Sequence, residues 1–225
     1  MSYSIPKPFG SAHRAGNSRK HALAAIEAGA DLLETDIWLH KGRLELRHKQ
    51  TLGPIPILWE KWSIAPGWTP RYYLRDLLHD VPEDILIFLD FKGEEMELGP
   101  EVLKELQQTA PNRTIAICGR NYPQLQVIAD EPNIICFYSV GSDEEWPVAK
   151  ELIARSTPPA LSIEASYATE ERVAWMNSID GLIVCWNVQT PERMRELRAL
   201  GVDGFTTDST DLLTRIRQFR DQDED

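Results

Sequence analysis

The sequence predicts an α/β fold, a (β/α)8 TIM barrel, because eight strand-like segments alternate with amphipathic ones along its 225 residues. The strand-like segments are short, apolar and mostly rich in β-branched residues, as strands buried on both faces are. They are "SIPKPFGSAHRA", "DLLETDIWL", "DILIFLDFK", "RTIAICGR", "NIICFYSV", "ALSIEAS", "GLIVCWNV" and "DGFTTD". Helix-like segments such as "NSRKHALAAIEAGA" and "TPERMRELRALGV" separate most of them. A chain of this length closes most economically into a barrel, and a doubly wound open sheet is the alternative.

Length and composition favour one domain. With 42% hydrophobic residues the chain can bury a full core. We therefore expect a single barrel domain over residues 1–225, with a short acidic tail at about residues 219–225. No apolar run has the length of a signal-peptide core or a membrane span, so we expect a cytoplasmic protein with no transmembrane segment.

Charge and cysteine content narrow the classes of partner. A formal net charge of -11 disfavours binding to nucleic acid and to anionic lipid surfaces, and leaves a local basic site for a small anionic substrate. Cys118, Cys136 and Cys185 each lie in an apolar strand-like run, so buried reduced thiols are expected.

Polar residues gather at the predicted strand ends, which meet at one mouth of a barrel. They are His13, Arg14, Glu34, Asp36, His48, Asp90, Lys92, Trp186 and Asp208. Residues i and i+2 of a strand share a face, so Glu34 with Asp36 and Asp90 with Lys92 form two inward pairs. Three converging carboxylates repel one another unless a cation lies among them, and hard oxygen ligands select Mg²⁺ or Ca²⁺. The alternative is a set of structural ion pairs with Arg14, Lys92 and Arg47.

The ordered motifs "AHRAGNS", "GADLLETDIWL", "RHK", "LDFKG" and "CWNVQTPERMRELRALGVDGFTTD" resemble the glycerophosphodiester phosphodiesterase family. The resemblance runs from His13 to about Asp208, and the middle of the chain shares only the alternation. It implies a (β/α)8 barrel and a divalent cation held by Glu34, Asp36 and Asp90. It also implies His13 and His48 as acid and base, with Arg14 and Lys92 on the phosphate. Trp186 resembles a tryptophan that lines the family's pocket, although it could equally be a core aromatic.

General chemistry agrees with these roles. An anionic phosphodiester resists attack until its nonbridging oxygens are neutralised, which a cation, an arginine and a lysine can do. One histidine would take a proton from the attacking hydroxyl and the other would protonate the leaving alkoxide. Which histidine does which is left open. The function expected is therefore hydrolysis of small glycerophosphodiesters to glycerol 3-phosphate and an alcohol. The alternatives are a phospholipase D-like lyase that forms a cyclic phosphate from a lysolipid, and a non-catalytic phosphate-binding barrel.

Several positions depart from the family pattern. Ala15 replaces the glycine of HRG, Gly16 replaces the glutamate of ENT, and Lys49 stands where an acid is common. Asn17 matches the asparagine of that triplet and is expected either near the site or as a helix N-cap. Asp90 is one methylene shorter than the family's usual glutamate.

The segment from residue 54 to residue 73 concentrates aromatic residues and prolines. We expect it to be irregular, and either a lid or apolar wall for a bulky alcohol, or a loop packed over the mouth or in a homodimer interface. Glu164, at the end of "LSIE", could also reach the pocket.

Overall fold

A computed structural model describes residues 5–51, 57–60, 63–66 and 69–223. Eight parallel strands form a closed ring, and each coincides with one of the predicted segments. They are β1 (Phe9–Ala12), β2 (Leu32–His40), β8 (Leu86–Phe91), β9 (Ile115–Gly119), β10 (Ile134–Val140), β11 (Ala160–Glu164), β12 (Leu182–Trp186) and β13 (Gly204–Thr207). The ring closes because β1 pairs in parallel with both β13 and β2. The (β/α)8 barrel is therefore confirmed.

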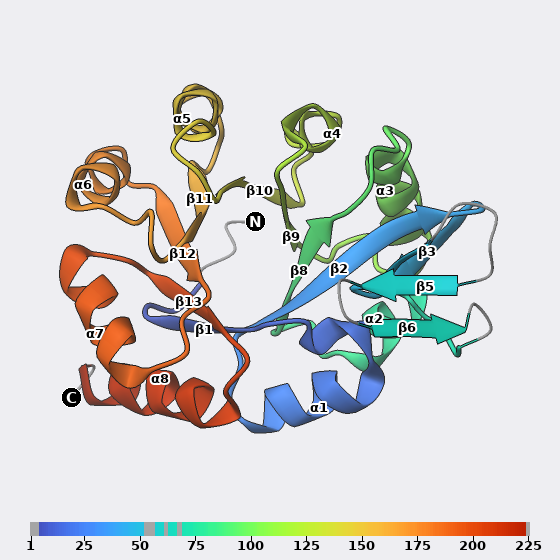
Figure 1. The fold of residues 1–225 in the computed structure, drawn as a ribbon, viewed down its shortest axis with the longest axis horizontal. Coiled ribbons are helices and arrows are strands. Elements are labelled where there is room, and N and C mark those ends of the chain that lie inside the picture. Colours follow the sequence, from blue (N-terminus) through green and yellow to red (C-terminus); the bar gives the residue numbers. More distant parts are fainter. Residues whose placement is uncertain (1–4, 52–56, 61–62, 67–68, 224–225) are drawn as a thin grey trace.

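Helices follow the strands and surround the ring (Figure 1). A short 3-10 turn, η1 (Ala15–Asn17), precedes the first helix. The helices are α1 (Arg19–Glu27), α2 (Leu74–Asp80), α3 (Leu98–Thr109), α4 (Tyr122–Gln126), α5 (Trp146–Ile153), α6 (Glu170–Ser178), α7 (Pro191–Leu200) and α8 (Thr210–Asp223). No helix among these is long and apolar enough to cross a bilayer.

Local sequence explains where α7 begins and ends. The Thr190 hydroxyl accepts a hydrogen bond from the backbone N–H of Arg193 at 3.2 Å, and Pro191 occupies the first turn, where its missing N–H costs nothing. Gly201 ends the helix at φ 104°, a conformation that only glycine adopts readily. The short loop between Trp186 and Pro191 therefore ends at a defined helix start.

The barrel interior changes from apolar to polar along the strands. Its apolar layers come mainly from the first halves of the strands. They comprise Ile5, Phe9, Leu32, Leu86, Phe88, Ala116, Cys118, Ile135, Phe137, Ala160 and Val184. Gly204 makes room for the Phe9 ring, because a Cβ there would lie 1.9 Å from Phe9 Cε2. The inward positions further along the strands are polar, so the C-terminal mouth is the chemically active end.

The connection between β2 and β8 differs from expectation. Part of residues 54–73 forms strands: β5 (Ile57–Glu60) and β6 (Ser63–Pro66) make an antiparallel sheet with β4 (Gln50–Thr51). Moreover, β3 (Arg43–Leu46) pairs with β2 and with β7 (Tyr72–Tyr73). Figure 1 shows the β5–β6 pair beyond the ring, on the side of β2 and β3. The expectation of an irregular loop is therefore wrong for these residues. They form extended strands that pair with one another. Two of the aromatic residues of this segment, Trp62 and Trp68, lie outside the described residues.

The last helix extends into the acidic C-terminal segment. Helix α8 continues to Asp223, so most of the predicted tail at 219–225 is helical. Arg220 explains this, because its Nη1 donates to the Pro8 carbonyl at 3.0 Å and to Asp31 Oδ2 at 2.9 Å. These bonds hold the end of the helix against the bottom of the barrel.

Candidate active site

One cavity of about 510 Å³ opens at the C-terminal mouth of the barrel. The eight residues to which the sequence assigned a catalytic, metal-binding or substrate-binding role all line it: His13, Arg14, Glu34, Asp36, His48, Asp90, Lys92 and Trp186. Its volume is in the range of small-molecule sites. The convergence expected from the strand ends is therefore present, and Trp186 lies in the pocket wall.

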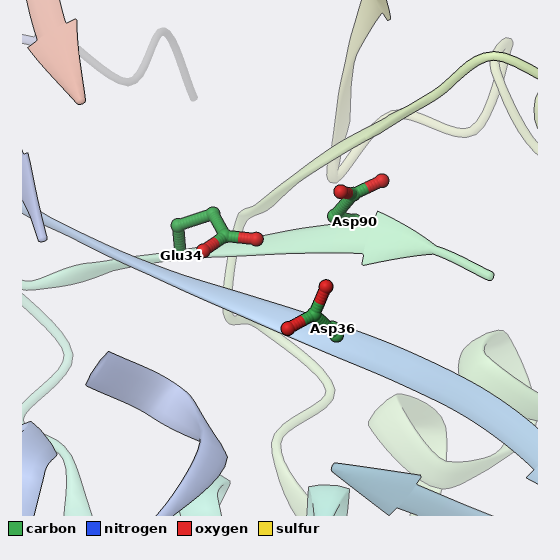
Figure 2. A group of neighbouring side chains, drawn as sticks. All are labelled: Glu34, Asp36 and Asp90. Carbon is green, nitrogen blue, oxygen red and sulfur yellow. The ribbon is translucent and has the colours of Figure 1, made fainter. Parts of the chain in front are cut away.

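Three carboxylates form the centre of this cavity. Glu34 and Asp36 project from β2, and Asp90 projects from the adjacent β8, where it is the register partner of Asp36. Figure 2 shows the three side chains gathered from these two strands, and one oxygen of each lies within 4.8 Å of the others. Glu34 and Asp36 are only 5% and 2% exposed. A cluster of this kind can bind a metal ion.

Burial and mutual repulsion weaken the acidity of two of these carboxyls. Burial raises the pKa of Glu34 well above its usual value, and the charges of Asp36 and Asp90 raise it further. Burial also raises the pKa of Asp90, and Lys92 offsets only part of the effect. The protein therefore holds these acids at an electrostatic cost, which a nearby positive charge would relieve.

Lys92 supplies part of that positive charge. Its Nζ hydrogen-bonds Asp90 and lies 3.2 Å from Asp36 Oδ1. Burial alone would lower the pKa of Lys92, but Asp90 and Asp36 outweigh it and raise that pKa above the usual value. The alternative to a cation site was a set of structural ion pairs, and Lys92 does form such pairs with the aspartates. Arg47 does not join them, because its Nε lies 2.7 Å from Glu45 Oε2.

Each histidine at the mouth has a different neighbour. His13 Nδ1 lies 2.7 Å from Asp208 Oδ1, and Gln189 Nε2 donates to the other oxygen of Asp208 at 3.0 Å. His48 Nε2 lies 2.6 Å from Arg14 Nη2. Because a guanidinium has only donors, His48 Nε2 must accept this bond. Asp208 and Arg14 therefore set which ring nitrogen carries the proton in each histidine.

Arg14 has an unusual backbone conformation that brings its N–H to the carboxylate cluster. Its φ of 54° lies in the left-handed region, which is rare for residues other than glycine. In this conformation the Arg14 N–H donates to Glu34 Oε2. The site thus constrains both the backbone and the side chain of this residue.

Asn17 belongs to the site and is not the helix cap. Its Nδ2 donates to Asp36 Oδ2 at 2.7 Å, and its Oδ1 accepts from the backbone N–H of Asp36 at 2.9 Å. Ser18 caps α1 instead. The structure explains why a glycine replaces the family's glutamate at position 16, because a Cβ there would lie 2.6 Å from Thr35 Cβ. A side chain at this position would therefore require Thr35 or the turn to shift.

The cavity is also lined by residues that sequence reasoning missed, among them Arg120, Asn121 and Gln189. Asp208, recognised only as a strand-end residue, does not line the cavity and reaches it through its contact with His13. Arg120 and Asp208 both directly follow a strand, which is the same signal that identified the other site residues. Glu164 ends β11 beside Trp186 but does not line the cavity. The described residues of 54–73 do not line it either.

Comparison with known proteins decides the family. The model of the glycerophosphoryl diester phosphodiesterase family matches residues 90–212, more than half of the chain. The protein belongs to this family. It is accordingly a phosphoric diester hydrolase. No curated protein matches the sequence.

Solved structures of low sequence identity share the fold. A glycerophosphodiester phosphodiesterase from Thermotoga maritima is 19% identical with a TM-score of 0.73, over 96% of this chain and 100% of that one. One from Parabacteroides distasonis is 16% identical with a TM-score of 0.74, over 99% and 100%. A phosphodiesterase from Oleispira antarctica, in complex with the product sn-glycerol-3-phosphate, is 15% identical with a TM-score of 0.73, over 94% and 97%.

Proposed function

We propose that this family member hydrolyses small glycerophosphodiesters to glycerol 3-phosphate and an alcohol, with a divalent cation and two histidines. The observation that carries the proposal is the shared cavity. It brings three carboxylates, two imidazoles, a guanidinium and an ammonium to one mouth of the barrel. The Oleispira antarctica phosphodiesterase, which has the same fold, was solved with the product that we propose here.

Glu34, Asp36 and Asp90 fit a hard divalent cation. Their donors are all carboxylate oxygens, close enough to share one ion, and Mg²⁺ and Ca²⁺ prefer such ligands. Burial and the neighbouring acids raise the pKa values of Glu34 and Asp90, and a cation among these carboxylates would offset that cost. When bound, such a cation would polarise the phosphoryl oxygens and offset their charge.

Arg14 and Lys92 are proposed to bind the phosphate. Both line the cavity, and Lys92 lies against Asp36 and Asp90. Arg14 offers a planar fork and Lys92 a point charge, so together they can bind two nonbridging oxygens.

His13 and His48 are proposed as the acid and base. A carboxylate accepts from His13 Nδ1, which leaves Nε2 of that ring for the substrate. Asp208 is thus a positioning residue for His13, and Gln189 holds Asp208 in turn. The non-catalytic alternative is disfavoured because simple phosphate binding needs no such proton-transfer pair.

Phosphorus NMR of the products tests this function. The purified protein is incubated with glycerophosphocholine, glycerophosphoethanolamine or lysophosphatidylcholine, with Mg²⁺, with Ca²⁺, or with EDTA. We expect cation-dependent formation of glycerol 3-phosphate that is lost in His13→Ala and His48→Ala. His79→Ala is the matched control, because the His79 side chain is 86% exposed on α2.

Three outcomes would contradict the proposal. A cyclic phosphate from the lysolipid, with no turnover of the water-soluble diesters, would favour the lyase. Full activity in EDTA, or in both histidine variants, would exclude the role of the cation or of the histidines.

A further inference from the structure

The cavity contains a third cation beyond the two proposed for the scissile phosphate. Arg120 directly follows β9, and Cys118 lies two residues before it. Both line the cavity, as expected for residues that share the inner face of a strand. Arg120 therefore belongs to the mouth of the barrel and not to its outer surface.

The guanidinium of Arg120 is hydrogen-bonded through its Nε edge. Its Nε donates to Glu145 Oε1 at 2.5 Å, and the other oxygen of Glu145 accepts from the backbone N–H of Gly141 at 2.7 Å. Within the described part of the chain, the Nη1 and Nη2 groups make no hydrogen bond. Since the side chain is 57% exposed, these two donors are accessible to a ligand.

Trp186 lies next to this guanidinium. A Cβ placed on Gly141 would lie 3.2 Å from two atoms of the Trp186 ring and 3.6 Å from Arg120 Cζ. The ring and the guanidinium therefore flank Gly141, one from the end of β12 and one from the end of β9. Together they form a corner with an apolar surface and two hydrogen-bond donors.

The scissile phosphate does not require this corner. Arg14 and Lys92, with a divalent cation, already balance the charges of the three acids and of a singly charged diester. Glu145 and Glu164 lie near Arg120, so long-range attraction at this corner is weak. Any selectivity must come from short hydrogen bonds of the guanidinium fork, which matches carboxylate and phosphate geometry.

We propose, on the basis of the function above, that Arg120 binds a second anionic group on the alcohol part of the substrate. The preferred substrates are then glycerophosphodiesters whose alcohol carries a carboxylate or a phosphate. Trp186 packs against the carbon atoms that link this group to the scissile phosphate. Arg120 determines specificity in this role and takes no part in proton transfer.

Two matched substrate pairs test the proposal. The first pair is glycerophosphoserine and glycerophosphoethanolamine, which differ by one carboxylate. The second pair is glycerophosphoglycerol and its derivative with a phosphate on the terminal hydroxyl, which differ by one phosphate. The ratio of kcat/KM within each pair is measured for the wild type, Arg120→Gln and Arg120→Lys. Arg155→Gln is the control, because Arg155 lies just beyond α5 with its side chain 72% exposed and paired to Glu151.

We expect the wild type to prefer the anionic member of at least one pair. Arg120→Gln should reduce the ratio of kcat/KM between the anionic and the other member about tenfold. This is at the low end for a charge-assisted hydrogen bond, because the site is partly exposed. Arg120→Lys should restore part of it, and Arg155→Gln should leave it unchanged. The pair that responds distinguishes a carboxylate from a phosphate.

The outcomes separate this proposal from the function on which it rests. Hydrolysis of the diesters with no preference for the anionic members, or with a ratio unaffected by Arg120→Gln, would overturn this proposal alone. Hydrolysis of none of them would overturn the proposed function and this proposal with it.

Discussion

Replacement of Glu34 by glutamine probes the carboxylate cluster, because it removes one charge and one oxygen ligand while keeping the size of the side chain. The structure predicts opposite effects with and without a cation. In the metal-free protein the variant should be more stable than the wild type near neutral pH. Burial and two neighbouring acids raise the pKa of Glu34, so its charged form opposes folding.

The sign of the pH dependence follows from the same shift. A carboxyl whose pKa is higher in the folded state binds its proton more tightly there than in the unfolded chain. Its stabilising contribution is complete below the unfolded pKa and is lost as the pH rises through the folded pKa. The metal-free wild type should therefore lose stability as the pH rises through this range, and Glu34→Gln should lose less.

Cation binding acts in the opposite direction and favours the wild type. At a cation concentration 100 times Kd, binding stabilises the folded state by about 2.7 kcal/mol. For a chain of this length that corresponds to a rise in Tm of roughly 5–10 °C. If loss of one of the three ligands raises Kd about 100-fold, the same concentration contributes only about 0.4 kcal/mol, or roughly 1 °C.

Thermal unfolding followed by circular dichroism, in EDTA and in millimolar Mg²⁺ or Ca²⁺, measures both effects. Glu164→Gln is the matched control, since Glu164 is also a glutamate on a barrel strand but lies outside the carboxylate cluster. An equal rise in Tm for the wild type and Glu34→Gln would refute the assignment of this cluster as the cation site. A metal-free Glu34→Gln less stable than the wild type would refute the electrostatic reasoning.

Three further predictions concern single contacts. Asp208→Asn should lower kcat at least about tenfold with little change in KM, because His13 and Gln189 bond different oxygens of Asp208 and asparagine keeps an acceptor at only one of these positions; steady-state kinetics test this, and an unchanged kcat would exclude the positioning role. Gly16→Ala should destabilise the protein by about 1–3 kcal/mol, since the added methyl would meet Thr35; urea unfolding measures it, and wild-type stability would show that the turn can shift without cost. Arg220→Ala should expose the last turn of α8 to hydrogen exchange by removing its bonds to Pro8 and Asp31; unchanged protection there would mean that other contacts hold the helix.

Much of the fold was predictable because its signals are local. Each barrel strand is a short apolar run, and each run is visible without knowledge of its neighbours. The inward direction of Glu34 and Asp36 follows from the two-residue period of a strand. The connection after His48 was harder to predict, because pairing among β4, β5 and β6 depends on partners that the composition of the segment does not specify.

The sequence by itself determined the barrel, the family motifs and the set of polar residues at the strand ends. Only the tertiary structure decided which of these residues touch. Asp208 meets His13 from the far end of the chain, Arg14 meets His48, and Glu145 orients Arg120. The physical reason is that residue type and period depend on the local chain, whereas these hydrogen bonds depend on the register in which the eight strands close.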